Sequence, residues 1–158
     1  MTAGHRKWFG MVTLVYLLGC SAAIVSAAPE VCFKKTCFNV EIAFTEEQKS
    51  EGLQHREILP PESGMLFVFG GNSRHRFWMK DTLIPLDIIW LDYAQKVVYI
   101  EHNAQPCSGE PCPSFSPDAN AMYVLEVNAG LAKEQKIKIG SAAAFKNVVV
   151  KVGLDPNE

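Results

Sequence analysis

The sequence predicts a mainly β protein of one domain, with its strands packed as a sandwich or a barrel. About seven short segments rich in β-branched and aromatic residues recur along the chain, and turn-forming residues separate them. No segment has an apolar periodicity long enough for a helix of more than two or three turns. The chain has 158 residues, of which 48% are hydrophobic and 20% charged, and these values fit a single globular domain.

The strand candidates differ in how deeply they should be buried. Residues 86–91 are apolar on both faces, which predicts a central strand, and the tight connection at 92–95 predicts a hairpin with residues 96–101. Residues 38–44 alternate apolar with polar or small side chains, as a half-buried strand does. The other strand candidates are residues 65–69, 76–80, 122–127, 137–140 and 147–152.

Two short helices are expected beside these strands. Thr45 and Gln48 form a capping-box pattern ahead of a helix at residues 46–53, and Asn128 is a candidate cap for a helix at 128–133. The alternation within the strands also predicts the core residues. These are Val40, Ile42, Phe44, Leu66, Val68, Phe77, Met79, Ile88, Trp90, Val98, Ile100, Val124, Val127 and Val149.

The N-terminal segment, residues 1–27, is expected to direct export, leaving 28–158 as the single β domain. Arg6 and Lys7 precede an uncharged apolar run, which is the layout of a secretory signal. Three interpretations remain open: a lipoprotein signal cleaved before Cys20, where lipid would attach; cleavage after residue 27; or an uncleaved anchor. All three place the domain outside the cytoplasm, in the periplasm, the cell envelope or the extracellular space.

The charge of the exported domain argues against two classes of partner. Removing Arg6 and Lys7 from the 15 basic residues leaves 13 against 17 acidic ones, a net charge of about −4. No basic stretch remains that would follow a nucleic-acid backbone or an anionic membrane surface. Contact with a membrane is therefore expected only through a lipid anchor or an uncleaved N-terminal segment.

Four further cysteines form two local pairs, Cys32 with Cys37 and Cys107 with Cys112. In an exported chain this even number predicts structural disulfides, and of the three connectivities the two local ones are favoured. Prolines at positions 106, 111 and 113 exclude the helix on which a redox pair normally stands. An oxidising compartment also argues against a thiolate zinc site, so no metal is predicted.

The most distinctive segment is 74–87, RHRFWMKDTLIPLD. At strand spacing Trp78 and Lys80 share one face, while Phe77 and Met79 take the other. Asp87 stands out because the residues expected to share its face are apolar. A buried carboxylate needs hydrogen bonds or an opposite charge, and Lys80 or Arg56 is the expected partner.

Five segments, taken together, closely resemble the domain of unknown function 192 family, a group of small bacterial and archaeal domains. Among them FWMKDTLIPLDI is the longest and most specific. The resemblance implies an antiparallel β-sandwich of jelly-roll type and implies no activity. This chain has Gln54 where the family usually has Met, and Asp81 where it usually has Asn. The five segments are residues 52–56, 64–69, 77–88, 102–107 and 123–130.

Nothing in the sequence calls for an enzyme mechanism or a cofactor. His55, His75 and His102 lie in three separate segments without metal-ligand spacing, and no nucleophile elbow, phosphate loop or dinucleotide motif is present. An exported accessory module that binds a small polar ligand or an envelope protein is therefore favoured. A purely structural interaction protein and a hydrolase-type enzyme of unrecognised class are the alternatives.

The candidate binding site is built on Trp78, which offers a stacking plane, and on polar side chains near it in sequence. The long loop at 103–120, carrying Cys107 and Cys112, is expected to form one wall. The alternative is that Trp78 caps the core and that the charged members form a structural ion-pair network. The candidate ligand-binding residues are Arg56, Trp78, Lys80, Asp81, Thr82 and Asp87.

Overall fold

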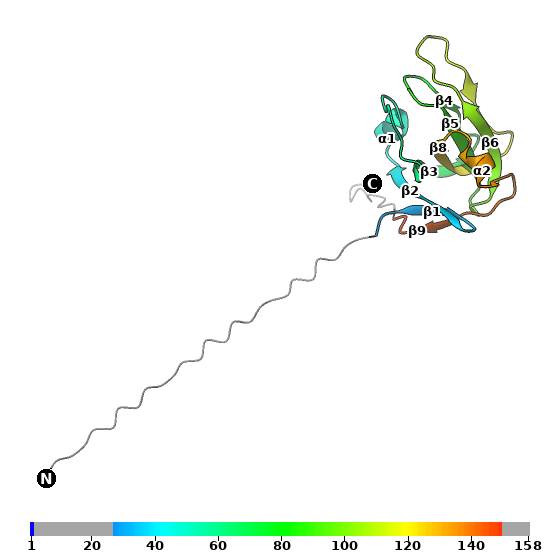
Figure 1. The fold of residues 1–158 in the computed structure, drawn as a ribbon. Helices are drawn as coiled ribbons and strands as arrows, with labels where there is room; N and C mark the ends of the chain where they lie inside the picture. The colour runs from blue at the N-terminus through cyan, green and yellow to red at the C-terminus, as the bar shows by residue number, and fades with distance from the viewer. Residues whose placement is uncertain (2–26, 150–158) are drawn as a thin grey trace, which may run out of the picture.

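The computed structural model describes Met1 and residues 27–149, and these later residues form one mainly β unit (Figure 1). Residues 2–26 of the proposed export signal, which include Cys20, and residues 150–152 of the last predicted strand lie outside the described residues. Among those described, no helix is both long and apolar enough to cross a bilayer.

A seven-stranded sheet dominates the fold, in the order β6-β5-β8-β3-β2-β1-β9, and it curls into a half-barrel (Figure 1). Its strands are β1 Glu30–Phe33, β2 Thr36–Ala43, β3 Ser63–Ser73, β5 Leu86–Leu91, β6 Val97–Ala104, β8 Ala121–Asn128 and β9 Ala144–Lys146. A second, two-stranded sheet pairs β4, Phe77–Trp78, with β7, Ser114–Phe115.

The fold class is confirmed, since strands predominate and the two helices are short. The jelly-roll sandwich is an approximation, because the main sheet is a single curled sheet in which β2 and β3 pair in parallel. A parallel pair needs a crossover connection, and α1, Glu46–Glu51, lies within it. Thr45 and Gln48 form the predicted capping box at the start of α1, and Gly52 ends the helix.

Both faces of the curled sheet are covered by apolar clusters, which is why β5 is buried along its whole length. Ile88 and Trp90 face one cluster, while Ile89 and Leu91 face the other. The β5–β6 hairpin and the central position of β5 agree with the sequence pattern.

Most of the predicted core is buried, and two predictions are wrong. Phe44 is 38% exposed because it follows the end of β2, and Val149 is 72% exposed because it lies beyond β9. Ile42, Val68, Val98 and Ile100 are half-buried. The remaining predicted core residues are buried: Val40, Leu66, Phe77, Met79, Ile88, Trp90, Val124 and Val127.

The C-terminal third differs from the predicted secondary structure in three places. Residues 137–140 form a turn rather than a strand, and the final strand is β9 instead of a segment starting at residue 147. Helix α2, Leu131–Glu134, is capped by Gly130 in a left-handed conformation. Asn128 is not its cap, because this side chain instead donates a 2.8 Å hydrogen bond to the carbonyl of Leu59.

Candidate ligand-binding site

Buried and exposed side chains alternate along the segment around β4, as the sequence predicts. Phe77 and Met79 are buried in the core, whereas Trp78 is 49% exposed. The Lys80 ammonium lies 5.4 Å from the centre of the Trp78 ring, within reach of a cation–π contact. The aromatic plane and the cation therefore share one outward surface.

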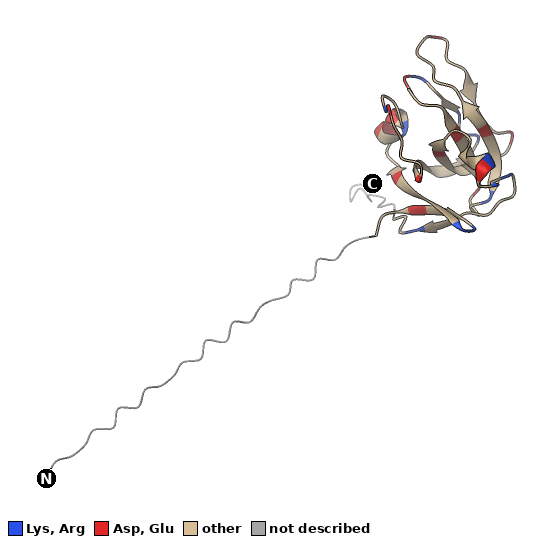
Figure 2. Ribbon diagram, viewed as in Figure 1, with Lys and Arg blue, Asp and Glu red and all other residues tan. Residues whose placement is uncertain are grey.

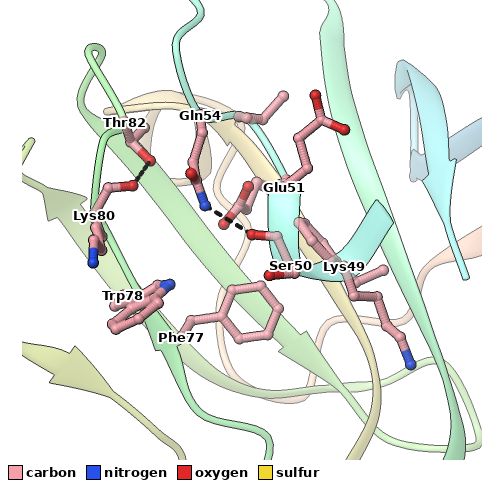
Figure 3. A pocket seen from close by; sticks show the side chains of 12 residues that line it. Lys49, Ser50, Glu51, Gln54, Phe77, Trp78, Lys80 and Thr82 are labelled. Carbon is pink, nitrogen blue, oxygen red and sulfur yellow. Dashed lines mark hydrogen bonds between the residues drawn. The ribbon is translucent and has the colours of Figure 1, made fainter. Parts of the chain in front are cut away.

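A small pocket of about 30 Å³ opens beside Trp78 (Figure 3). Helix α1 and the turn after it supply Ser50 and Gln54, and the β4 segment supplies Trp78, Lys80 and Thr82. Thr82 is buried, and its hydroxyl donates to the Lys80 carbonyl at 3.4 Å. The Gln54 amide donates to the Ser50 carbonyl at 2.7 Å, so both side chains are held at the pocket.

The long disulfide-bearing loop lies against this surface. The N–H of Asp81 donates to the Cys107 carbonyl at 3.0 Å, and the N–H of Cys107 donates to the Met79 carbonyl at 3.1 Å. Farther along the loop, Glu110 pairs with Lys80 at 2.8 Å. The hydrogen bond between them raises the pKa of Lys80 and lowers the pKa of Glu110.

Both local cysteine pairs are placed as disulfides, Cys32 with Cys37 and Cys107 with Cys112. The two bridges indicate a compartment other than the reducing cytoplasm. The Glu30 carboxylate lies close to the first pair, but those two sulfurs are bonded to each other and are not thiolate ligands.

Arg56 does not line the pocket. Both terminal nitrogens of its guanidinium bond to the Glu41 carboxylate on β2, one of them at 2.6 Å. This pairing lowers the pKa of Glu41 and raises that of Arg56. The predicted grouping of Arg56 with Trp78 and Lys80 is therefore not found, because its charge is engaged at a different place.

Asp87 is fully buried, as expected, but its predicted partners are wrong. One carboxylate oxygen accepts the N–H of Asn103 at 2.9 Å, and the other accepts the N–H of Ala132 at 2.8 Å. His102 Nδ1 lies 3.9 Å away. Asp87 therefore ties the end of β6 to α2, and the hollow it lines contains neither Trp78 nor Lys80.

Several pocket residues were absent from the predicted site, and the buried acid Glu126 is one of them. It lies on β8 between β3 and β5, is 4% exposed, and lines the pocket beside Trp78. Burial alone raises its pKa to about 8, with no compensating hydrogen bond or cation among the described residues. The available signal was a carboxylate inside the apolar strand MYVLEV. At neutral pH this group is mainly a neutral carboxylic acid.

A family model described as "Uncharacterized ACR", DUF192, matches residues 30–145 of this chain. The chain belongs to the DUF192 family. That range includes both disulfide pairs, the β4 segment and Glu126, so the pocket described above is part of the DUF192 domain itself.

Two solved structures support the DUF192 fold. A protein of unknown function from Novosphingobium aromaticivorans DSM 12444 is 31% identical, with a TM-score of 0.67 over 77% of this chain and 89% of that one. A Sinorhizobium meliloti 1021 protein, to which a transcription-regulator role has been ascribed, is 30% identical, with a TM-score of 0.69 over 80% and 100%. No curated protein matches at a significant level.

Asp81 has a backbone role that Asn could also fill. Its φ is 53°, in the left-handed region that Asp and Asn tolerate better than most side chains. Its carbonyl accepts the N–H of His55 at 2.8 Å. The turn made by Asp81 directs Lys80 and Thr82 to their places at the pocket.

Proposed function

We propose that this DUF192 domain is an exported accessory module that binds a small polar ligand at the surface of Trp78, Lys80 and Thr82. The observation that carries the proposal is that Trp78 is half exposed beside a pocket, while its neighbours Phe77 and Met79 fill the core. An indole held in this way offers a ligand a flat apolar face with polar groups next to it.

The rigidity of this surface also supports a binding role. The loop closed by Cys107 and Cys112 is tied to the Trp78 side through Glu110 and Lys80. A surface whose side chains are already held in place loses less conformational freedom when a ligand binds. The disulfides, together with the expected signal at residues 1–27, support export.

The transcription role ascribed to the Sinorhizobium relative is not carried over to this chain. Residues 28–158 have a net charge of about −4, and acidic and basic residues are interspersed along the described part of the ribbon (Figure 2). Nucleic-acid binding depends on a concentrated basic surface, because the phosphate backbone supplies much of the affinity.

A thermal-shift screen of the full chain tests the proposal, using neutral, acidic and basic small molecules. Because ligands stabilise the state that binds them, we expect at least one compound to raise Tm for the wild type and not for Trp78→Ala. Tyr93→Ala is the matched control, since Tyr93 is an exposed aromatic outside the pocket. An equal shift in Trp78→Ala, or no shift with any compound, would count against the site.

A further inference from the structure

Glu126 places a buried carboxyl group in the lining of the pocket. Its side chain is more than nine-tenths buried and lines the pocket, while no described residue offers its carboxyl a stabilising hydrogen bond. A carboxyl group that lines a pocket can bond to a ligand group that enters it. As a neutral acid it presents one O–H donor and a carbonyl acceptor.

The lysines at the pocket do not select a charged ligand, because each already has an acidic partner. Lys80 pairs with Glu110 at 2.8 Å, and Lys49 pairs with Glu46 at 2.5 Å. Figure 3 shows the Lys49 ammonium pointing away from Trp78 and Thr82. An anionic ligand would therefore gain little from these cations.

Apart from Glu51, which is exposed to solvent, the other polar groups at the pocket are uncharged. Thr82 contributes a hydroxyl, and Gln54 keeps its amide oxygen as an acceptor while its nitrogen bonds to Ser50. Hydroxyls, amides and a protonated carboxyl all both donate and accept, which is also the hydrogen-bonding character of an alcohol. A cationic ligand would instead require Glu126 to lose its proton.

The size of the pocket limits what enters it. A volume of about 30 Å³ holds one small group, such as a hydroxyl, and not a whole ligand. Two more hollows border Trp78, one shared with Arg76 and Ser114 and the other with Lys49 and Phe69. The body of the ligand would therefore lie on Trp78, outside the pocket.

From these observations we infer that the ligand is a neutral saccharide, with one hydroxyl bonded to Glu126 inside the pocket and its ring stacked on Trp78. This inference rests on the proposed function and adds the ligand class. A sugar ring has an apolar face that suits an indole, and its hydroxyls match the uncharged donors and acceptors.

Nuclear magnetic resonance titration of the full chain is the test. The probes are glucose, mannose, galactose, N-acetylglucosamine, maltose and cellobiose, with glucosamine and glucuronate as charged counterparts. We expect at least one neutral sugar to shift the Trp78 indole N–H signal, assigned with Trp78→Phe. The Trp90 indole is the internal reference, because it is buried and bonded to the His75 carbonyl at 2.9 Å.

Variants at Glu126 test the proposed contact. Glu126→Gln keeps a donor and an acceptor, so it should bind the neutral sugar within a few fold of wild type, whereas Glu126→Leu should lose at least tenfold. Wild-type affinity should change as the pH rises through about 8, where Glu126 loses its proton, and that of Glu126→Gln should not. Lys49, Glu51 and Lys80, the other titratable groups lining the pocket, are common to both proteins, so the difference isolates Glu126.

Three results would count against the inference, and they have different consequences for the proposed function. If only glucosamine or glucuronate shifts the Trp78 signal, the site binds a ligand but the neutral saccharide class is wrong. If no probe shifts it, the saccharide inference fails, and the thermal-shift screen then decides separately whether the site binds any small molecule. Equal sugar affinity in Glu126→Leu and wild type would remove Glu126 from the contact.

Discussion

The Lys80 ammonium lies 5.4 Å from the centre of the Trp78 ring while it also pairs with Glu110 at 2.8 Å. One side chain thus connects the exposed indole to the loop closed by Cys107 and Cys112. This connection places a flat apolar surface and a disulfide-closed loop side by side.

The first prediction concerns this connection. Glu110→Gln should speed amide hydrogen exchange in the loop at 107–112, because the charge that holds the loop to Lys80 is lost. The midpoint of denaturation should hardly change, since exposed ion pairs contribute little to stability. Ser108→Ala, on the same loop, is the control, and equal exchange in Glu110→Gln and wild type would show that the ion pair does not hold the loop.

The second prediction concerns Glu126 and pH. Its pKa is about 8 in the folded protein and about 4.5 in the unfolded chain, so the folded state binds the extra proton between these values. The stability that protonated Glu126 contributes is therefore fully present below pH 4.5 and is lost as the pH rises toward 8. The loss is up to about 5 kcal/mol, because each unit of difference between the folded and unfolded pKa corresponds to about 1.36 kcal/mol.

Glu126→Gln should remove that loss. In urea denaturation at pH 5, 6, 7 and 8, its stability relative to wild type should increase steadily with pH. Glu57→Gln, the same change at an exposed position, should follow wild type. A constant difference between Glu126→Gln and wild type would mean that Glu126 is ionised throughout this range.

The third prediction concerns Asp87, which accepts backbone hydrogen bonds from Asn103 and Ala132. Asp87→Ala leaves both N–H groups without this acceptor and should lower the free energy of unfolding by about 2–4 kcal/mol. Asp118→Ala, at an exposed aspartate, should change it little. Denaturation curves measure both, and a neutral Asp87→Ala would show that the two bonds are replaceable.

The fourth prediction concerns export and the disulfides. Intact-mass analysis of the native protein should find a chain that begins at lipidated Cys20 or at Ala28, or that stays in the membrane through its uncleaved segment. Non-reducing peptide mapping should link Cys32 to Cys37 and Cys107 to Cys112. A soluble cytoplasmic chain that begins at Met1, or free thiols at these four positions, would contradict export.

Local patterns predicted the parts of the site that depend on neighbours in sequence. The alternation in 76–80 placed Trp78 and Lys80 on one face, and Thr45 with Gln48 predicted the cap of α1. Residues 86–91 predicted a strand buried on both faces, because its apolar run is uninterrupted except for Asp87.

Contacts between distant segments were not predictable in the same way. Lys80 or Arg56 was the expected partner of Asp87, but the backbone N–H groups of Asn103 and of Ala132, 45 positions later, bond to it instead. Arg56 pairs with Glu41 on β2 because the chain must return to β2 before β3 can pair with it in parallel. Glu126 was visible as an acid in an apolar strand, but its place at the pocket depends on how β8 lies between β3 and β5.

The most direct test of the account compares the stabilities of two tryptophan variants without any ligand. Trp90 is fully buried, so Trp90→Ala should lower the free energy of unfolding by about 3–5 kcal/mol through the cavity it leaves. Trp78→Ala should leave the stability of the full chain nearly intact, because that indole is 49% exposed and lies at the surface. If Trp78→Ala instead loses as much as Trp90→Ala in the same urea denaturation experiment, Trp78 is a core residue and the proposed binding surface is wrong.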